Sequence, residues 1–334
     1  MAHSPDEEFG HSLDRMLPGI AWGFLERTPP TRRGNVEAML IGAVTPDLLE
    51  FDATTAPKLV FVQGLSTGVD GFPYQRFPDN VRFAGNVGAF APFVAEHAIA
   101  LALAAARDLR AAREKVRSGR RRPPPDQRLL YGATAVILGY GAIGREIAPR
   151  LSAFGTRVYG VSRTGSPAPG AERMFGADRL LDALRESDLV FDARPLTRLT
   201  AGTIGATELA AMRPEGVLVM VGRAGTVDEE ALYRHLVDHP SFRAASDVWW
   251  DEDFPNGVFR SRWPFSELRN FVGTPHSAGA VEGAGGRGVQ LALENLSRYF
   301  RDGRPAHLVD RSEYEAVSRP SPARGAPRRS GGDR

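Results

Sequence analysis

A glycine-rich hexapeptide is the part of this sequence whose spacing points most directly to chemistry. Residues 139–144 read Gly-Tyr-Gly-Ala-Ile-Gly, after a predicted strand and at the start of a predicted helix. In this spacing the first glycine makes a tight turn, the second lets the backbone approach a pyrophosphate, and the third packs the helix on the strand. The amides at the helix start would face phosphate oxygens, where the helix dipole favours negative charge. The alternative is a tight turn without a ligand. We predict a dinucleotide site at Gly139, Gly141, Ala142, Ile143 and Gly144.

The residues after the next predicted strand bear on which dinucleotide is bound. The strand at 157–161 ends in Ser162, Arg163 and Thr164, where domains that prefer NAD usually carry an acid that binds the ribose hydroxyls. An acid facing the 2′-phosphate of NADP at about 4 Å would cost roughly 1 to 4 kcal/mol, and an arginine there would gain a similar amount. We therefore predict NADP, with NAD as the alternative. For Arg163 the alternative is stacking on adenine or exposure to water.

Strands and helices alternate on both sides of the glycine loop. Short apolar runs predict strands at 38–43 and 58–63, with a helical turn at 45–51 between them. The alternation predicts an α/β protein with two doubly wound parallel sheets. Further strands are predicted at 133–138, 157–161, 189–193, 217–221 and 242–245, and helices at 93–109, 144–154, 180–186, 208–212, 229–237 and 285–300.

Two segments differ in composition from the rest. Residues 110–127 contain six arginines, one lysine and three consecutive prolines, which favours an exposed extended segment. We interpret it as a solvated loop, with an anion-binding arm as the alternative. Residues 318–334 are rich in Pro, Gly, Ser and Arg and predict a disordered tail.

Several further motifs, in order, resemble those of the D-isomer-specific 2-hydroxyacid dehydrogenase family. The Ser-Arg-Thr strand end makes glyoxylate/hydroxypyruvate reductases the nearest branch. The resemblance covers residues 59–300 and implies a flavodoxin-like substrate domain over 1–92, completed by about 289–317, and a Rossmann cofactor domain over 93–288, with a cleft between them. The motifs are Gly68-Val69-Asp70, Val94-Ala95-Glu96-His97, Pro195-Leu196-Thr197, Val227-Asp228-Glu229-Glu230-Ala231-Leu232, Asp247-Val248 and Thr274-Pro275-His276.

The resemblance also implies the reactive groups. It makes His276 the general acid/base, Glu252 the carboxylate that orients it, and Arg223 the ligand of the substrate carboxylate and carbonyl. Reducing a 2-oxo acid requires a proton on oxygen as hydride reaches carbon, and an imidazolium is the natural donor near neutral pH. An arginine fork binds a carboxylate through two bonds. Taken singly, His276 could satisfy a turn, Glu252 could pair with a surface arginine and Arg223 could cap a helix.

The remaining site residues follow from the same resemblance. Asp247 is expected near the nicotinamide carboxamide and Pro195 beside the cofactor, while Thr67 and Gly68 offer backbone amides to the substrate carboxylate. The implied reaction is NAD(P)H-dependent reduction of a small 2-oxo acid, such as glyoxylate or hydroxypyruvate, to the D-2-hydroxy acid.

Departures from the family pattern leave the substrate open. Ala224 follows Arg223 where glycine is usual, and Asp253 follows Glu252 where proline is usual. One alternative is therefore the same chemistry on a phosphonate-bearing, bulky or aromatic 2-oxo acid. Another is a regulatory protein that senses NAD(H).

The composition excludes several classes of protein. The chain has no cysteine, which excludes disulfides, thiolate nucleophiles and cysteine-ligated metals. Of the 42 basic residues only Lys58 and Lys115 are lysines, and we attribute the excess of arginine to coding bias. The 40 acidic residues are interspersed among the basic ones and the net charge is +2, so we predict no nucleic-acid partner. Histidines and carboxylates show no metal-ligand spacing, and we predict no metal.

The sequence also predicts the location of the protein and its binding partners. Its first ten residues are acidic and lack the pattern of a secretory signal. The most apolar stretch, 93–106, contains Glu96 and His97 and is too short to span a bilayer. We predict a cytoplasmic protein without a membrane partner, whose partners are the small acid and, by resemblance, a second copy in a homodimer.

Overall fold

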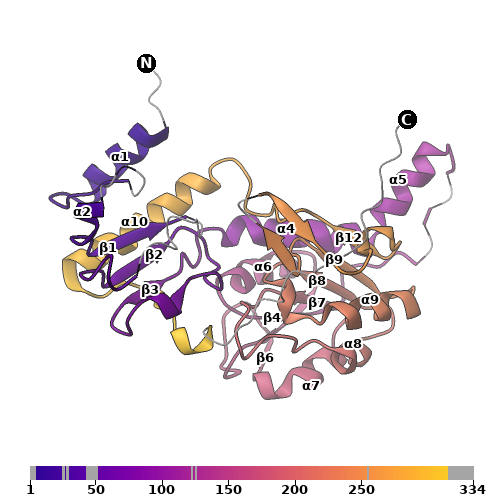
Figure 1. Ribbon diagram of the computed structural model, residues 1–334. Coiled ribbons are helices and arrows are strands. Elements are labelled where there is room, and N and C mark those ends of the chain that lie inside the picture. The colour runs from indigo at the N-terminus through magenta and orange to yellow at the C-terminus, as the bar shows by residue number, and fades with distance from the viewer. Residues whose placement is uncertain are drawn as a thin grey trace.

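The computed structural model describes residues 5–24, 27, 30–42, 52–121, 123–124, 126–253 and 256–314. They form two α/β units, each built around a parallel sheet (Figure 1). The chain passes from the smaller unit to the larger one through α4 (Ala91–Ala106) and returns through α10 (Ala284–Asp302). The predicted α/β class with parallel sheets is confirmed.

The larger sheet has seven strands in the order β12-β9-β8-β7-β4-β5-β6, and each neighbouring pair is parallel. Its central strands are fully buried, as expected for a parallel sheet covered on both faces. The strand order reverses at β4, and ligands of such sheets bind outside the carboxyl ends of the strands at this point. The strands are β4 (Thr134–Leu138), β5 (Arg157–Val161), β6 (Arg173–Phe175), β7 (Leu189–Asp192), β8 (Val217–Met220), β9 (Arg243–Ser246) and β12 (Phe271–Gly273).

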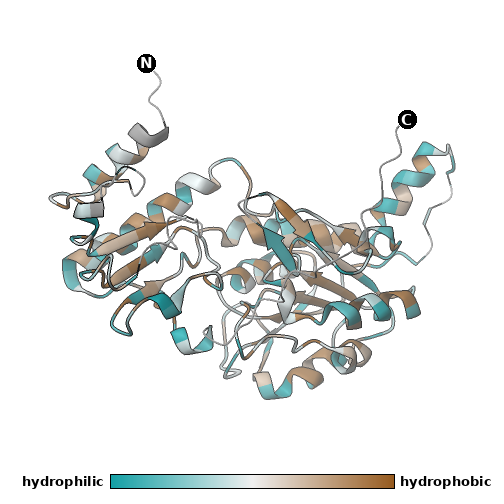
Figure 2. Cartoon of the chain, in the orientation of Figure 1, coloured by the Kyte–Doolittle hydropathy of each residue, from teal (hydrophilic) through white to brown (hydrophobic). Residues whose placement is uncertain are grey.

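Helices cover both faces of the larger sheet. The helices α4 and α6 (Ala142–Ala153) pack on one face. The helix α4 contacts both the larger sheet and α6, so alanine and leucine lie around most of its circumference. The other face is covered by α7 (Leu180–Arg185), α8 (Ala206–Ala211) and α9 (Glu229–Asp238). Figure 2 shows the strands between these layers as mostly apolar.

The smaller sheet has three parallel strands, β1 (Ala38–Ile41), β2 (Phe61–Gly64) and β3 (Arg82–Ala84), in that order. The helix α1 (Pro5–Met16) and α10 pack on one face around the ring of Phe61, which stacks on Tyr299 at 4.6 Å. An aromatic cluster that includes Tyr74 and Phe83 covers the other face. The two units therefore have separate cores.

Asn295 on α10 fixes the returning chain to the smaller sheet. Its amide nitrogen donates to Oε1 of Gln63 at 2.6 Å and to the carbonyl of Ala306 at 3.0 Å, and its oxygen accepts from the amide of Ala306 at 2.6 Å. Gln63 is fully buried, and an unpaired polar group there would cost free energy. The segment after α10 is thus held beside β2.

Short elements complete the described chain. An antiparallel hairpin of β10 (Asp251–Asp253) and β11 (Val258–Arg260) stands outside the larger sheet. The other short elements are the helices α2 (Pro30–Arg33) and α5 (Leu109–Arg117) and the 3₁₀ turns η2 (Tyr74–Arg76), η3 (Ala177–Arg179), η4 (Ala224–Thr226), η5 (Phe265–Glu267) and η6 (Arg311–Glu313).

The prediction of an extended segment at 110–127 is wrong for its first part. Residues 109–117 form α5, which projects from the larger unit (Figure 1). Asp108 caps this helix by accepting a hydrogen bond from the amide of Ala111 at 3.2 Å, and the alanines, arginines, glutamate and lysine that follow are strong helix formers. The prolines begin only at Pro123, beyond the helix. The predicted exposure is correct, because α5 buries none of its residues.

Other differences have simple physical causes. The strands β3, β6 and β12 have three residues each, too few to show a periodic pattern, and the amphipathic helix α1 was not predicted. The predicted helical turn at 45–51 and the predicted tail at 318–334 lie outside the described residues.

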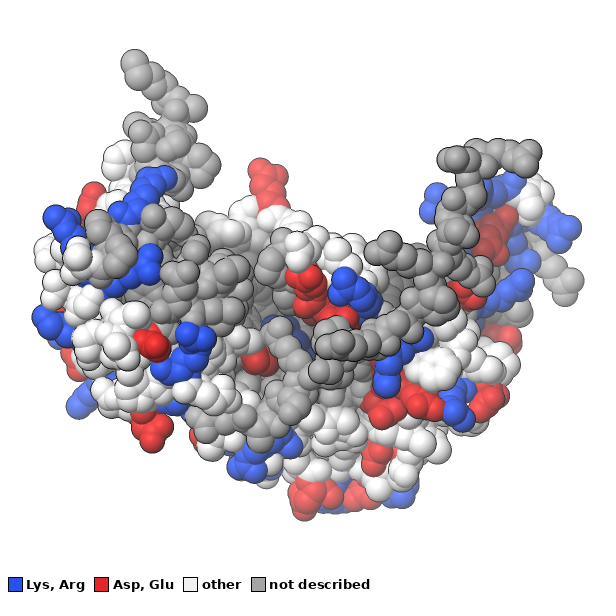
Figure 3. Space-filling model, viewed as in Figure 1, with Lys and Arg blue, Asp and Glu red and all other residues white. Residues whose placement is uncertain are grey.

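Within the described part of the chain, no helix is long and apolar enough to cross a bilayer. Basic and acidic side chains are interspersed on the face drawn in Figure 3.

Candidate active site

The glycine loop between β4 and α6 has the local geometry that a pyrophosphate site requires. Gly139 adopts φ +83°, a left-handed conformation that favours glycine. A β-carbon at Gly144 would lie 2.6 Å from the carbonyl oxygen of Gly139, so glycine is needed for α6 to pack on β4. A β-carbon at Gly141 would meet no described heavy atom within 4 Å. The space beside Gly141 is therefore open, as the predicted approach of a pyrophosphate to this backbone requires.

A buried ion pair lies against this loop. Arg194 donates to both carboxylate oxygens of Asp192, from Nη2 at 2.6 Å and from Nε at 2.9 Å. Thr203 accepts from Nη1 of Arg194 at 2.8 Å, and Thr226 donates to Asp192 at 2.9 Å. The backbone of Arg194 packs against Gly139, whose β-carbon would lie 3.0 Å from the Arg194 amide nitrogen. The pair fixes the ends of β7 and β8 beside the loop, a role that the sequence did not indicate.

The three residues predicted to bind the adenosine end lie together after β5. Ser162 accepts a hydrogen bond from the amide of Gly165 at 3.1 Å, and Thr164 forms an isolated bridge with Gly176. The side chain of Arg163 is 75% exposed, and its Nη1 lies 2.9 Å from Oε1 of Glu313. Glu313 belongs to the last described turn, 150 residues further along the chain, and was not predicted.

The structure brings His276 and Glu252 together, as the resemblance implied. Nδ1 of His276 lies 2.7 Å from Oε1 of Glu252, which stands on β10 of the hairpin. A carboxylate only accepts hydrogen bonds, so Nδ1 carries the proton of this bond. Proton exchange with a substrate would then run through Nε2. His276 has φ +53°, a left-handed conformation that is unusual for a residue with a side chain.

Asp247 holds the segment that carries His276. It is 1% exposed, and its Oδ1 accepts from the hydroxyl of Thr274 at 2.6 Å and from the amide of Ser277 at 2.9 Å. Its Oδ2 accepts from the amide of Ala278 at 2.9 Å. These bonds lie on both sides of His276 and stabilise its strained backbone. The predicted proximity of Asp247 to the nicotinamide stays a prediction.

His97 on α4 supports the same segment. Its Nε2 lies 2.9 Å from the hydroxyl of Thr274 and 3.4 Å from Oδ1 of Asp247. The ring joins α4 to the strand ends of the larger sheet. Through Thr274 and Asp247 it supports the segment that carries His276.

Trp249 joins the hairpin to the His276 segment. Its backbone amide donates to Oε1 of Glu252 at 3.0 Å, and its indole nitrogen donates to the carbonyl of Thr274 at 2.9 Å. The indole is 8% exposed and stacks on Phe259 at 4.4 Å. One residue therefore joins the carboxylate, through its backbone amide, to the segment that carries the imidazole, through its side chain.

Arg223 reaches from the larger unit to the smaller one. It follows β8, and its Nε donates to Oδ1 of Asp70 at 3.0 Å while its Nη1 donates to the carbonyl of Gly222 at 3.0 Å. A β-carbon at Gly68 would overlap Nη2 of Arg223, so the guanidinium lies directly against the Gly68 backbone. Burial raises the pKa of nearby Tyr314 to about 12, and the carboxylate of Asp70 adds to the shift.

The other predicted residues lie on the loops around these groups. The hydroxyl of Thr67 donates to the carbonyl of Asn86 at 3.1 Å, which fixes the loop that contains Gly68. The carbonyl of Pro195 accepts from the hydroxyl of Thr200 at 2.6 Å, next to the Asp192–Arg194 pair. Asp70 was visible in the sequence only as the last residue of the Gly68-Val69-Asp70 motif, without an assigned role.

A family model matches more than half of the chain. The model describes the NAD binding domain of D-isomer specific 2-hydroxyacid dehydrogenases and matches residues 99–278. A glyoxylate reductase from Thermococcus kodakarensis is 34% identical over 281 residues, which cover 81% of this chain and 81% of the relative.

Solved structures share the fold. One is a D-isomer specific 2-hydroxyacid dehydrogenase from Xanthobacter autotrophicus in complex with NADPH and MES, with a TM-score of 0.74 and 25% identity over 93% of this chain and 96% of that one. Another is an NADPH-dependent glyoxylate/hydroxypyruvate reductase from Sinorhizobium meliloti in complex with NADP and malonate, with a TM-score of 0.68 and 25% identity over 88% and 90%.

The contact between Gly68 and Arg223 predicts a steric effect. Gly68→Ala places a methyl group where Nη2 of Arg223 lies, so the guanidinium must move. We expect kcat/KM to fall by at least about tenfold, or roughly 1.4 kcal/mol of transition-state stabilisation. Steady-state kinetics measure this. Gly42→Ala is the control, because among the described residues a β-carbon there meets only Cδ1 of Leu65, at 3.6 Å. Equal losses in both variants would contradict the prediction.

The two indoles predict a difference between matched variants. Trp249→Phe removes the bond to Thr274, and Trp250→Phe removes a 2.7 Å bond from the Trp250 indole to the carbonyl of Val227. We expect each to lower the free energy of unfolding by about 1 kcal/mol in urea titrations. Only Trp249→Phe should also lower kcat, by about fivefold, because it loosens the Glu252–His276 geometry. The same kcat in both variants would remove Trp249 from this role.

Proposed function

The chain belongs to the D-isomer specific 2-hydroxyacid dehydrogenase family, and from this premise we propose how it works and on what. It is an NAD(P)-dependent oxidoreductase that reduces 2-oxo acids. We propose that the substrate is a small 2-oxo acid of the glyoxylate or hydroxypyruvate type and that the product is the D-2-hydroxy acid. The bonded His276–Glu252 pair is the observation that carries the proposal, because it is built to deliver a proton.

The residues after β4 and β5 are proposed to hold the cofactor. The glycine loop would take the pyrophosphate, with the dipole of α6 favouring its charge. Ser162, Arg163 and Thr164 would take the adenosine end, where a guanidinium favours a 2′-phosphate. When bound, the reduced nicotinamide supplies the hydride.

His276 is proposed to supply the proton. With Nδ1 held by Glu252, the ring donates from Nε2 and is left as a neutral imidazole that still bonds to the carboxylate. Glu252 stabilises the imidazolium that precedes this step and fixes the ring orientation. Asp247 keeps the backbone of residues 274–278 in place during the transfer.

Arg223 is proposed to bind the substrate carboxylate and to polarise its carbonyl. Its guanidinium lies against Gly68, so the amides of Thr67 and Gly68 can bind the same carboxylate. The bond from Nε to Asp70 holds the side chain in this direction before a substrate arrives. The bonded His276–Glu252 pair and an arginine held against Gly68 favour an enzyme over a protein that only senses NAD(H).

The domain limits remain proposals. We propose that residues 1–92, completed by about 289–317, form the substrate domain and that residues 93–288 form the cofactor domain. The separate cores of the two sheets support this division. The homodimer stays a prediction.

A substrate panel tests the reaction. We expect NADPH oxidation, followed at 340 nm, with glyoxylate or hydroxypyruvate among a series of 2-oxo acids. His276→Ala should lower kcat by about 10²- to 10⁴-fold because it removes the proton donor. His239→Gln is the control, since His239 stacks on His235 at the end of α9 and is not part of the site. No oxidation with any acid would overturn the proposed reaction, and an unchanged His276→Ala variant would remove His276 from its role.

Cofactor choice tests the assignment of Arg163. Arg163→Gln removes the cation proposed to face the 2′-phosphate, so kcat/KM for NADPH should fall by about tenfold or more while that for NADH changes little. The ratio of the two values is the measurement. Arg234→Gln, which removes an arginine paired with Glu230 on α9, should leave the ratio unchanged. A ratio that stays constant in Arg163→Gln would contradict the assignment.

A further inference from the structure

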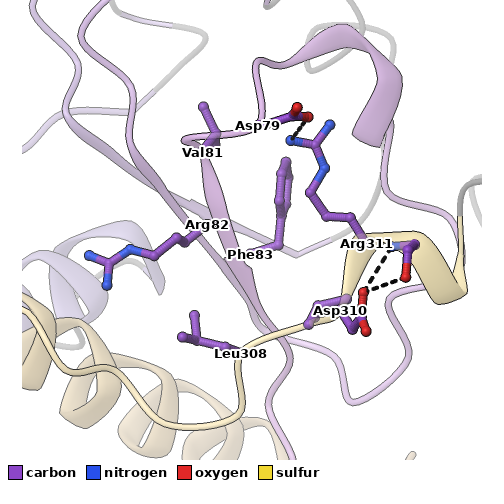
Figure 4. A pocket seen from close by; sticks show the side chains of 9 residues that line it. Asp79, Val81, Arg82, Phe83, Leu308, Asp310 and Arg311 are labelled. Carbon is purple, nitrogen blue, oxygen red and sulfur yellow. Dashed lines mark hydrogen bonds and ion pairs between the residues drawn. The ribbon is translucent and has the colours of Figure 1, made fainter.

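The last described segment of the chain is anchored to the smaller unit. Leu308 forms an antiparallel bridge with Ala84 of β3, and the amide of Val309 donates to the carbonyl of Phe83 at 2.8 Å. Figure 4 shows Arg311 extending past Phe83 toward Asp79, and the two charged groups lie 3.6 Å apart.

Arg311 anchors the turn further through the backbone. Its Nη2 donates to the carbonyls of Tyr74 at 2.6 Å and Phe77 at 2.9 Å, and its Nη1 donates to that of Pro78 at 2.7 Å. The turn η6 therefore has a fixed position at the edge of the smaller sheet.

The same turn contacts the larger unit beside the adenosine end of the proposed cofactor site. Arg198 donates from its amide to the carbonyl of Glu313 at 2.9 Å and from Nε to the carbonyl of Ser312 at 2.9 Å. The Glu313 side chain is 12% exposed and lies 2.9 Å from Nη1 of Arg163, which is 75% exposed. The backbone that carries the carboxylate is thus held in place and the Glu313 side chain is largely buried, whereas the arginine side chain that it contacts is mostly exposed.

We propose that Glu313 is a specificity-determining residue, which opposes the 2′-phosphate at Arg163 and thereby limits the preference for NADPH over NADH. The inference rests on the proposed function, because it takes Arg163 as the group that faces the 2′ position. A phosphomonoester carries about −1.5 to −2 charges at pH 7. If Arg163 binds it through the same guanidinium, the carboxylate and the phosphate stand within a few ångströms and repel each other.

NADH presents a hydroxyl instead of a phosphate to the same carboxylate. Its 2′-hydroxyl carries no charge and can donate a hydrogen bond, and NAD-preferring domains use an acid for this bond at the end of the second strand. Here the strand end supplies an arginine, and the acid comes from the far end of the described chain. The repulsion therefore acts on one cofactor and not on the other.

Nucleotide fragments test this without the reaction. Isothermal titration with 2′,5′-ADP and 5′-AMP measures binding with and without the 2′-phosphate. Glu313→Gln keeps an oxygen that accepts from Arg163 but removes the charge. We expect this variant to bind 2′,5′-ADP about tenfold more tightly than the unchanged protein and to bind 5′-AMP with unchanged affinity. The ratio of kcat/KM for NADPH to that for NADH should rise by a similar factor. Glu313→Ala should act in the same direction.

The control and the opposing outcomes are specific. Glu267→Gln removes an exposed charge from η5 and should change neither affinity. Weaker binding of 2′,5′-ADP by Glu313→Gln would overturn the inference, because Glu313 would then serve to position Arg163. Unchanged binding of both nucleotides would also overturn it, with the proposed function intact. If the unchanged protein binds neither nucleotide, the assignment of the adenosine end fails and the inference with it. Binding of both fragments without reduction of any 2-oxo acid would overturn only the reaction.

Discussion

The buried carboxylate of Asp247 is the interaction on which the site depends. An ion that is 1% exposed is costly unless hydrogen bonds replace its water, and Asp247 has three such bonds from residues 274–278. They hold a backbone in which His276 has φ +53°, a conformation that costs about 1 to 2 kcal/mol for a residue with a β-carbon. The three hydrogen bonds offset both the cost of the buried charge and the backbone strain, and they fix the direction of the imidazole. Trp249 then sets the position of Glu252 relative to that ring.

A second constraint is that each arginine proposed to bind an anion already contacts an acid of the smaller unit. Arg223 contacts Asp70, and Arg163 contacts Glu313. An incoming carboxylate or phosphate must share or replace these acids, so part of its attraction to the arginine is offset. In return, each guanidinium is held beside the smaller unit by the acid that it contacts. Affinity and orientation are therefore linked at both ends of the proposed site.

The sequence was most informative where a few consecutive residues determine the geometry. The glycine loop, β4 and α6 were predicted because turn, strand and helix are adjacent and each glycine has a local reason. The α5 helix was mispredicted because prolines beyond its end were given more weight than the cap at Asp108. Contacts between distant parts of the chain gave no local signal: Arg223 meets Asp70 across 153 residues. Family resemblance predicted the His276–Glu252 pair, and no spacing rule would have done so.

The Arg163–Glu313 contact illustrates why stability and specificity must be considered separately. An ion pair whose arginine is mostly exposed adds little to the free energy of unfolding, because water and salt screen the charge and ordering the long side chain costs entropy. Specificity, however, depends only on a difference between two ligands. Contributions that are common to NADPH and NADH cancel in the ratio of their affinities, whereas the contribution of the charge at the 2′ position does not. A carboxylate held by the backbone of η6 can therefore be nearly neutral for folding and still influence which cofactor is used.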